Sequence, residues 1–146
     1  MKLDSVIDRL SDQCPSLNLV GGGAEYAIAM TSLTTFPAAF ALPSREIAAP
    51  PAWASMVIEQ RVAGEFGVAI AVRNLGDKTG KAAVGTLHPV RIEVRNALLN
   101  WQPPGDEVEG PFDGCEFVGG EITAFANNIL WWTDIFRTAF TIRSTS

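Results

Sequence analysis

Two glycine-containing segments come nearest to a nucleotide-binding loop. Residues 76–82 read Gly-Asp-Lys-Thr-Gly-Lys-Ala, but only three residues separate the two glycines. A phosphate-binding loop needs four, and Ala82 stands where that loop places the hydroxyl that holds magnesium. Gly21–Gly23 begins like a dinucleotide-binding fingerprint, yet Tyr26 occupies the position of its last small residue. We interpret both segments as turns and expect no cofactor.

The remaining residues with nucleophilic or metal-binding chemistry are one histidine and two cysteines. His88 is the only histidine, and no Gly-x-Ser-x-Gly motif accompanies it. Cys14 and Cys115 lack the spacing of metal ligands and are too few for a disulfide scaffold. The sequence therefore predicts no catalytic residue and no metal site, and the two cysteines are expected to behave as small apolar residues.

A long acidic stretch lies in the second half of the chain. No Lys or Arg occurs from Asn96 to Phe136, although the stretch contains seven acids. Four of them lie close together and form a candidate acidic face: Asp106, Glu107, Glu109 and Asp113. One interpretation is a solvated loop rim, and the other is a face that repels DNA phosphates or meets a basic partner.

One carboxylate lies among aromatic residues in a strand-like segment near the end of the chain. Alternation places Trp132, Asp134 and Phe136 on one face of that strand. A buried carboxylate is strongly destabilising unless a donor meets it. The candidate donors are Arg91 and Arg95, on the helix expected to cover the sheet. The alternative is that Asp134 pairs across a subunit boundary.

Hydrophobic periodicity and turn residues define the elements that must position these side chains. Helices are predicted at residues 3–13, 24–30 and 86–100, and strands at 38–42, 55–73, 117–126 and 129–143, with a strand or an extended turn at 17–20. Residues 44–54, 74–80 and 106–116 are predicted loops. Asn127-Asn128 is the expected hairpin turn, and Pro89 leaves the start of the third helix open.

This order of elements predicts a single α+β domain over residues 1–146. The sheet is expected to be largely antiparallel or mixed, with the helices packed on one face. Gly64 permits a bend in the long central strand, so a hairpin is expected to project from the domain. The candidate interface residues at that point are Gln60, Arg61, Glu65 and Phe66.

Composition restricts the class of partner. The chain has 146 residues and a formal net charge of −5, which argues against non-specific binding to nucleic acid or to an anionic membrane. No apolar run approaches the ~20 residues of a membrane-spanning helix. Charged residues make up 18% of the chain and apolar residues 47%. A low charge content of this kind favours a protein that covers much of its surface with partners.

The chain resembles the phage tail terminator proteins, in particular those of Mu-like and related prophages. The resemblance depends on an ordered set of segments that spans most of the chain. These are the helix segment at 3–10, Phe-Ala-Leu-Pro at 40–43, the strand segments at 60–62, 66–68 and 71–74, the helix end at 94–105, Phe-x-Gly-Gly at 117–120, and Leu-Trp-Trp-x-Asp-x-Phe at 130–136. Pro89, with Gly80 and Gly85, departs from the smooth helix expected of the family.

The resemblance implies a structural protein of the virion and no enzyme. Such subunits form a hexameric ring that caps the tail tube at its head-proximal end, stops tube polymerisation and gives the head connector a joining surface. The implied partners are further copies of the chain, the tail tube protein and the connector, and DNA passes through the lumen without specific binding. Assembly would take place in the host cytoplasm, with no membrane involved. The alternatives are another head–tail connector or minor tail protein, or a small ligand-binding domain.

Overall fold

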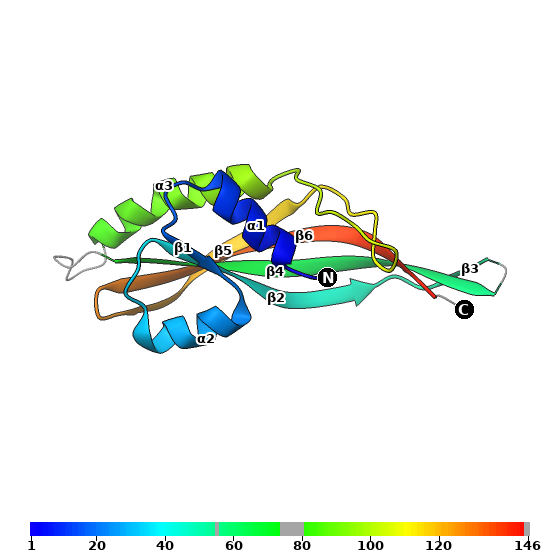
Figure 1. Cartoon of the computed structure of the whole chain (residues 1–146), viewed down its shortest axis with the longest axis horizontal. Coiled ribbons are helices and arrows are strands. Elements are labelled where there is room, and N and C mark those ends of the chain that lie inside the picture. The colour runs from blue at the N-terminus through cyan, green and yellow to red at the C-terminus, as the bar shows by residue number, and fades with distance from the viewer. Residues whose placement is uncertain (55, 74–80, 145–146) are drawn as a thin grey trace.

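The computed structural model describes residues 1–54, 56–73 and 81–144. Figure 1 shows an elongated molecule in which helices lie above and below one long sheet. The elements are α1 (Asp4–Gln13), β1 (Leu19–Gly21), α2 (Gly23–Ser32), β2 (Ala38–Ala48), β3 (Ala52–Ala54), β4 (Val57–Arg73), α3 (Lys81–Leu98), β5 (Glu116–Ala126) and β6 (Ile129–Arg143). The predicted loop at 74–80, with most of the phosphate-loop-like segment, lies outside the described residues.

A mixed six-stranded sheet organises the fold, which confirms the predicted α+β class. The strand order is β1-β2-β4-β6-β5, and β3 pairs with the start of β4. Only β1 and β2 run parallel, and the other neighbours are antiparallel. Asn127 and Asn128 have φ angles of 55° and 63°, as a tight two-residue hairpin turn between β5 and β6 requires.

The helices do not all pack on one face, contrary to the expectation from sequence. Residues of α1 and α3 share a core with Val68 and Ile70 of β4. Ala69 of the same strand points the other way, into a second core that includes Ala29 of α2 and Trp131. Because the second half of β4 is apolar at successive positions, both of its faces need cover, and α2 supplies the second (Figure 1).

Two boundaries also differ from prediction. Residues 44–54 are not a loop, since β2 continues to Ala48 and β3 follows at Ala52–Ala54. A register shift between Pro43 and Arg45 lets the strand continue past the proline. Helix α3 begins at Lys81, and Pro89 lies inside it. Pro89 has no backbone N–H to donate to the carbonyl oxygen of Gly85, so one helical hydrogen bond is missing. Both residues are exposed, so the site of the missing bond faces water.

Candidate functional site

Asp134 lies in a buried charge cluster between the sheet and α3. Its carboxylate is fully buried. Arg91 donates from Nη2 to Oδ1 at 2.8 Å and from Nε to Oδ2 at 3.2 Å, and the Trp132 indole N–H donates to Oδ1 at 2.8 Å. The Arg91 guanidinium also lies over the Trp132 ring, 4.3 Å from its centroid. The carboxylate is therefore held by charge-assisted bonds within one subunit.

Backbone geometry on β5 makes room for this cluster. Gly120 pairs with Asp134 across the two strands. A Cβ atom at Gly120 would lie 2.2 Å from Asp134 Oδ1 and 2.8 Å from Trp132 Nε1. The position therefore requires glycine for reasons of space. The Gly119-Gly120 pair was noted in the sequence, but only the strand register shows that Gly120 faces Asp134.

Arg95, the other candidate donor to Asp134, contacts a different side chain. Its guanidinium lies over the Phe117 ring at 5.3 Å. Its Nε is a buried nitrogen with no hydrogen-bond partner among the described residues. Of the two arginines, only Arg91 has hydrogen bonds to Asp134.

The four candidate interface residues fall into two groups. Gln60 and Arg61 lie near the start of β4, and both are partly exposed. Arg61 donates to Thr141 Oγ1 at 3.2 Å and pairs with Asp113. Phe66 is fully buried in the core, so it is not a surface residue as the sequence analysis expected. The sequence analysis grouped Phe66 with Gln60 because both lie near the Gly64 bend, but alternation along β4 turns Phe66 into the core with Val68 and Ile70.

Glu65 is the buried carboxylate of the opposite sheet face. It pairs with Arg45 of β2 and with Arg137 of β6, whose Nη2 lies 2.9 Å from its Oε1. Hydrogen bonds from these two arginines lower the pKa of the Glu65 carboxyl below its ordinary value. Glu65 therefore has both of its ion-pair partners within the subunit, so its charge is not available to a neighbouring subunit.

Three of the four acids in the candidate acidic face have partners within the chain. Asp106 accepts hydrogen bonds from the backbone N–H groups of Val108 and Glu109, both at 2.8 Å, and these bonds lower its pKa. Glu109 also lies 2.9 Å from the Met1 amino group. Asp113 pairs with Arg61, as described above. These contacts fix the acidic loop to the rest of the subunit. Glu107, on the same loop, is exposed.

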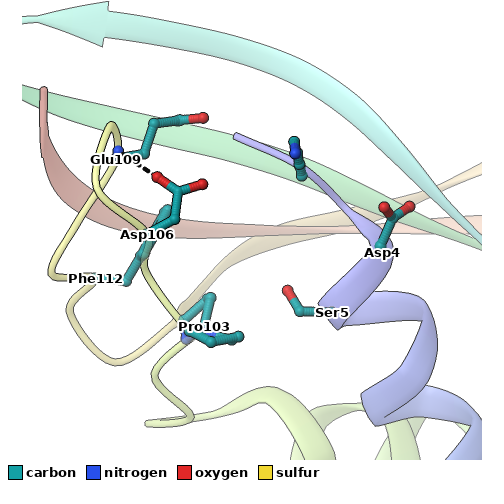
Figure 2. Close-up of a pocket in the computed structure, with 8 residues that line it drawn as sticks. Asp4, Ser5, Pro103, Asp106, Glu109 and Phe112 are labelled. Atoms are coloured by element: carbon teal, nitrogen blue, oxygen red, sulfur yellow. Dashed lines mark hydrogen bonds between the residues drawn. The ribbon is translucent and has the colours of Figure 1, made fainter.

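A small pocket lies between this loop and the start of α1. Figure 2 shows Asp4 and Ser5 on one side and Pro103, Asp106 and Phe112 on the other. Its volume is about 180 Å³, below the ~300 Å³ at which small-molecule sites usually begin. This pocket is too small to argue for a ligand-binding domain; a larger hollow of about 330 Å³ lies over β5 and β6, beside Val118, Glu121 and Thr133.

The sequence analysis expected a projecting hairpin here but missed that its outer part is an exposed apolar arm. We define the arm as residues 47–54 and 56–58, which contain no charged residue. It includes β3 and the start of β4 and extends beyond the helices (Figure 1). Trp53 is 71% exposed and Met56 is 91% exposed. The absence of charge over this range was the available signal, but the prolines in it favoured a loop.

Two classes of site are not found in the described part of the chain. Within residues 1–54, 56–73 and 81–144, no group of three His, Cys, Asp or Glu side chains could hold a metal ion. None of the helices described there is long and apolar enough to cross a membrane.

The long sheet and the exposed apolar arm are typical of a subunit that packs against other proteins. The chain belongs to the phage tail terminator protein family, whose model matches residues 1–146. It is a structural component of a phage tail. No curated protein matches the chain.

Proposed function

We propose that this protein forms a hexameric ring that caps the tail tube. The ring stops tube polymerisation at the head-proximal end and offers the head connector a surface to join. DNA passes through the lumen without specific binding. The chain acts as a structural part throughout and carries out no catalysis.

The arm is the observation that carries this proposal. It places apolar side chains in water, beyond the helices that cover the rest of the sheet. Large exposed apolar groups on a monomer are typical of a surface that another protein covers. A ring that must also contact a tube below and a connector above needs such surfaces on more than one side.

Charge is consistent with passage of DNA. Binding to DNA depends on Lys and Arg side chains that neutralise phosphates. Here the net charge is −5, and several of the arginines are engaged with carboxylates of the same chain: Arg45, Arg61, Arg91, Arg137 and Arg143. A lumen lined by such a subunit would hold DNA weakly.

Tube capping provides the test. Purified tail tube protein is polymerised with and without this protein, and tube lengths and ends are imaged by electron microscopy. We expect shorter tubes with a six-fold ring at one end. Tubes of unchanged length with bare ends would overturn the proposal.

A second assay separates the alternative of a connector or minor tail protein. Such a protein would join tails to heads without changing tube length. Mixing capped and uncapped tubes with connector-bearing heads should show joining only by the capped tubes. Joining that requires this protein while tube length stays unchanged would favour the alternative, whereas joining by tubes without it would show that the protein offers no joining surface.

A further inference from the structure

Four charged side chains of alternating sign cross the sheet in one row. They come from four neighbouring strands, and each lies directly opposite the next in the strand register: Arg45 of β2, Glu65 of β4, Arg137 of β6 and Glu116 of β5. Residues that oppose each other on neighbouring strands point to the same face of a sheet. We call these four residues the charge row.

The two inner members of the charge row have a partner on each side. Glu65 pairs with Arg45 and with Arg137. Arg137 in turn lies between Glu65 and Glu116, with its Nη1 3.6 Å from Glu116 Oε1. An arginine side chain has five N–H donors, so it can serve two carboxylates at once. The inner part of the row is therefore satisfied within the subunit.

The two end members have a partner on one side only. Arg45 donates to Glu65 from Nε, and its other nitrogens have no hydrogen bond to the described residues. Within the same described ranges, the one partner of Glu116 is the long contact with Arg137. The side chains of Arg45 and Glu116 are 61% and 67% exposed. The row thus ends at β2 in a cation that can take a second carboxylate, and at β5 in a weakly paired carboxylate.

Neighbouring charges do not cancel these two ends. Glu46, the next residue of β2, points to the other face, where it accepts a hydrogen bond from the Met1 amino group. At the other end, no Lys or Arg occurs between residues 96 and 136. The second acid of β5, Glu121, is exposed and lies on the same face as Glu116. On this face, the β2 edge is therefore basic and the β5 edge is acidic.

We propose that Arg45 of one subunit pairs with Glu116 of a second copy of this chain. The inference rests on the proposed ring, because a contact between two different edges is head-to-tail, and repeated contacts of that kind build rings. Contacts between like edges are disfavoured, since two β2 edges would bring two arginines together and two β5 edges would bring two glutamates together. The charge row of each subunit then continues into the next.

Strand direction agrees with this arrangement. Each of β2, β4, β6 and β5 runs antiparallel to the next, so a neighbouring β5 beside β2 keeps the alternation. Backbone pairing is not expected there. Strand β1 occupies the outer side of β2 as far as Phe40, and register shifts interrupt β2 and β5 next to Arg45 and Glu116. The contact is therefore made by the long side chains.

A zero-length crosslink tests the pair. Arg45→Lys keeps the positive charge and supplies an amine that a carbodiimide joins to a carboxylate in contact with it. Isotope-labelled and unlabelled samples of this variant are mixed at high concentration, crosslinked and mapped by mass spectrometry. A crosslinked product that contains both isotopes joins two copies. We expect such a product between positions 45 and 116, and its absence would overturn the proposal.

Glu121 is the matched control carboxylate, because it is an exposed acid on the same strand and the same face. Between copies, the 45–116 link should be several-fold more abundant than a 45–121 link. Adding Glu116→Gln should remove the link between copies and leave the link to Glu65 within one copy. Equal abundance of the 45–116 and 45–121 links would reject a specific pair.

Charge reversal gives a second readout. Arg45→Glu and Glu116→Arg each place like charges at every contact, so each variant alone should associate several-fold more weakly than the wild type. In an equimolar mixture, alternating copies restore opposite charges at every contact, so sedimentation should recover the wild-type association. A mixture no better than the single variants would reject the pair. Circular dichroism checks the fold, and if a reversal variant is unfolded, the crosslink with the conservative Arg45→Lys decides.

Crosslinking of tubes separates this contact from the proposed ring. Capped tubes whose caps lack the 45–116 link would leave the ring in place and reject the contact. Uncapped tubes, together with a strong 45–116 link in the free protein, would reject the cap and retain the contact.

Discussion

Asp134 and Glu65 are carboxylates buried on opposite faces of the same sheet, and the two faces treat them differently. Asp134 lies beneath α3, where Arg91 and an indole N–H satisfy it. Glu65 is covered by two arginine side chains that themselves reach water, since Arg45 is 61% exposed and Arg137 is 39% exposed.

The difference shows which of the two ion pairs is part of the folded core. Breaking a buried ion pair leaves an uncompensated charge in a poorly solvated place, which costs several kcal/mol. Breaking a pair whose partner reaches water costs far less, because water solvates the remaining charge. Asp134 should therefore control folding, whereas Glu65 should adjust stability with pH.

The largest effect is expected at Gly120. Gly120→Ala would place a methyl group against the Asp134 carboxylate and the Trp132 indole. The carboxylate would have to move and lose its bonds, so we expect a loss of at least about 3 kcal/mol of unfolding free energy. Denaturant unfolding provides the measurement.

Gly119→Ala is the matched control for that change. A Cβ atom at Gly119 would meet no atom within 4 Å. It should leave the unfolding free energy almost unchanged. Equal losses at the two positions would show that strand flexibility, and not space at the charge cluster, explains the glycines.

Removal of the Asp134 charge comes next. Asp134→Asn keeps the size of the side chain but weakens the charge-assisted bonds from Arg91, so stability should fall by about 1–3 kcal/mol. Asp113→Asn, at a well-exposed carboxylate, is the control and should cost less than about 1 kcal/mol. Wild-type stability of Asp134→Asn combined with lost capping would move Asp134 to a subunit boundary.

Local sequence pattern predicted much of the sheet. Alternation and the Asn127-Asn128 turn located β6 at the residues observed, because a strand with one buried face shows its period directly. The same alternation put Asp134 on the face toward α3, where Arg91 reaches it.

The sequence pattern gave wrong predictions for a strand that is covered on both faces and for one that is covered on neither. The apolar second half of β4 does not reveal which helix covers which face, so α2 was placed wrongly. The arm has no buried face of its own and contains Pro50 and Pro51, so β3 showed no period to detect. Glu65 was taken for a surface residue because its partners come from two distant strands.

The third prediction uses Glu65 to sharpen the contrast with Asp134. Glu65→Gln removes the charge that Arg45 and Arg137 hold, and we expect a loss of about 1 kcal/mol or less at neutral pH. The pKa of Glu65 is lowered in the folded protein, so its contribution is present above the unfolded value of 4.5 and is lost as the pH falls through the folded value.

Melting temperatures measured as a function of pH provide the check. The gap between wild type and Glu65→Gln should shrink as the pH falls below 4.5. A gap that stays constant would show that Glu65 acts through packing and not through charge.

The smallest effect on stability is expected at Arg61. Its ion pair with Asp113 is more exposed than the pairs of Asp134 and Glu65. Arg61 is 40% exposed and its partner Asp113 is 63% exposed. Arg61→Glu breaks this pair in water, so the melting temperature of the subunit should hardly change. Arg61 lies at the base of the arm, however, and a reversed charge there should impair capping of the tail tube. The double variant Arg61→Glu with Asp113→Arg restores the ion pair but keeps the reversed charge at position 61. If the double variant also fails to cap, the positive charge of Arg61 at the base of the arm is what a neighbouring protein recognises. If the double variant caps normally, Arg61 serves only to hold the acidic loop through Asp113. If the single variant Arg61→Glu is unfolded, Arg61 is instead one of the residues that maintain the fold, as Asp134 is.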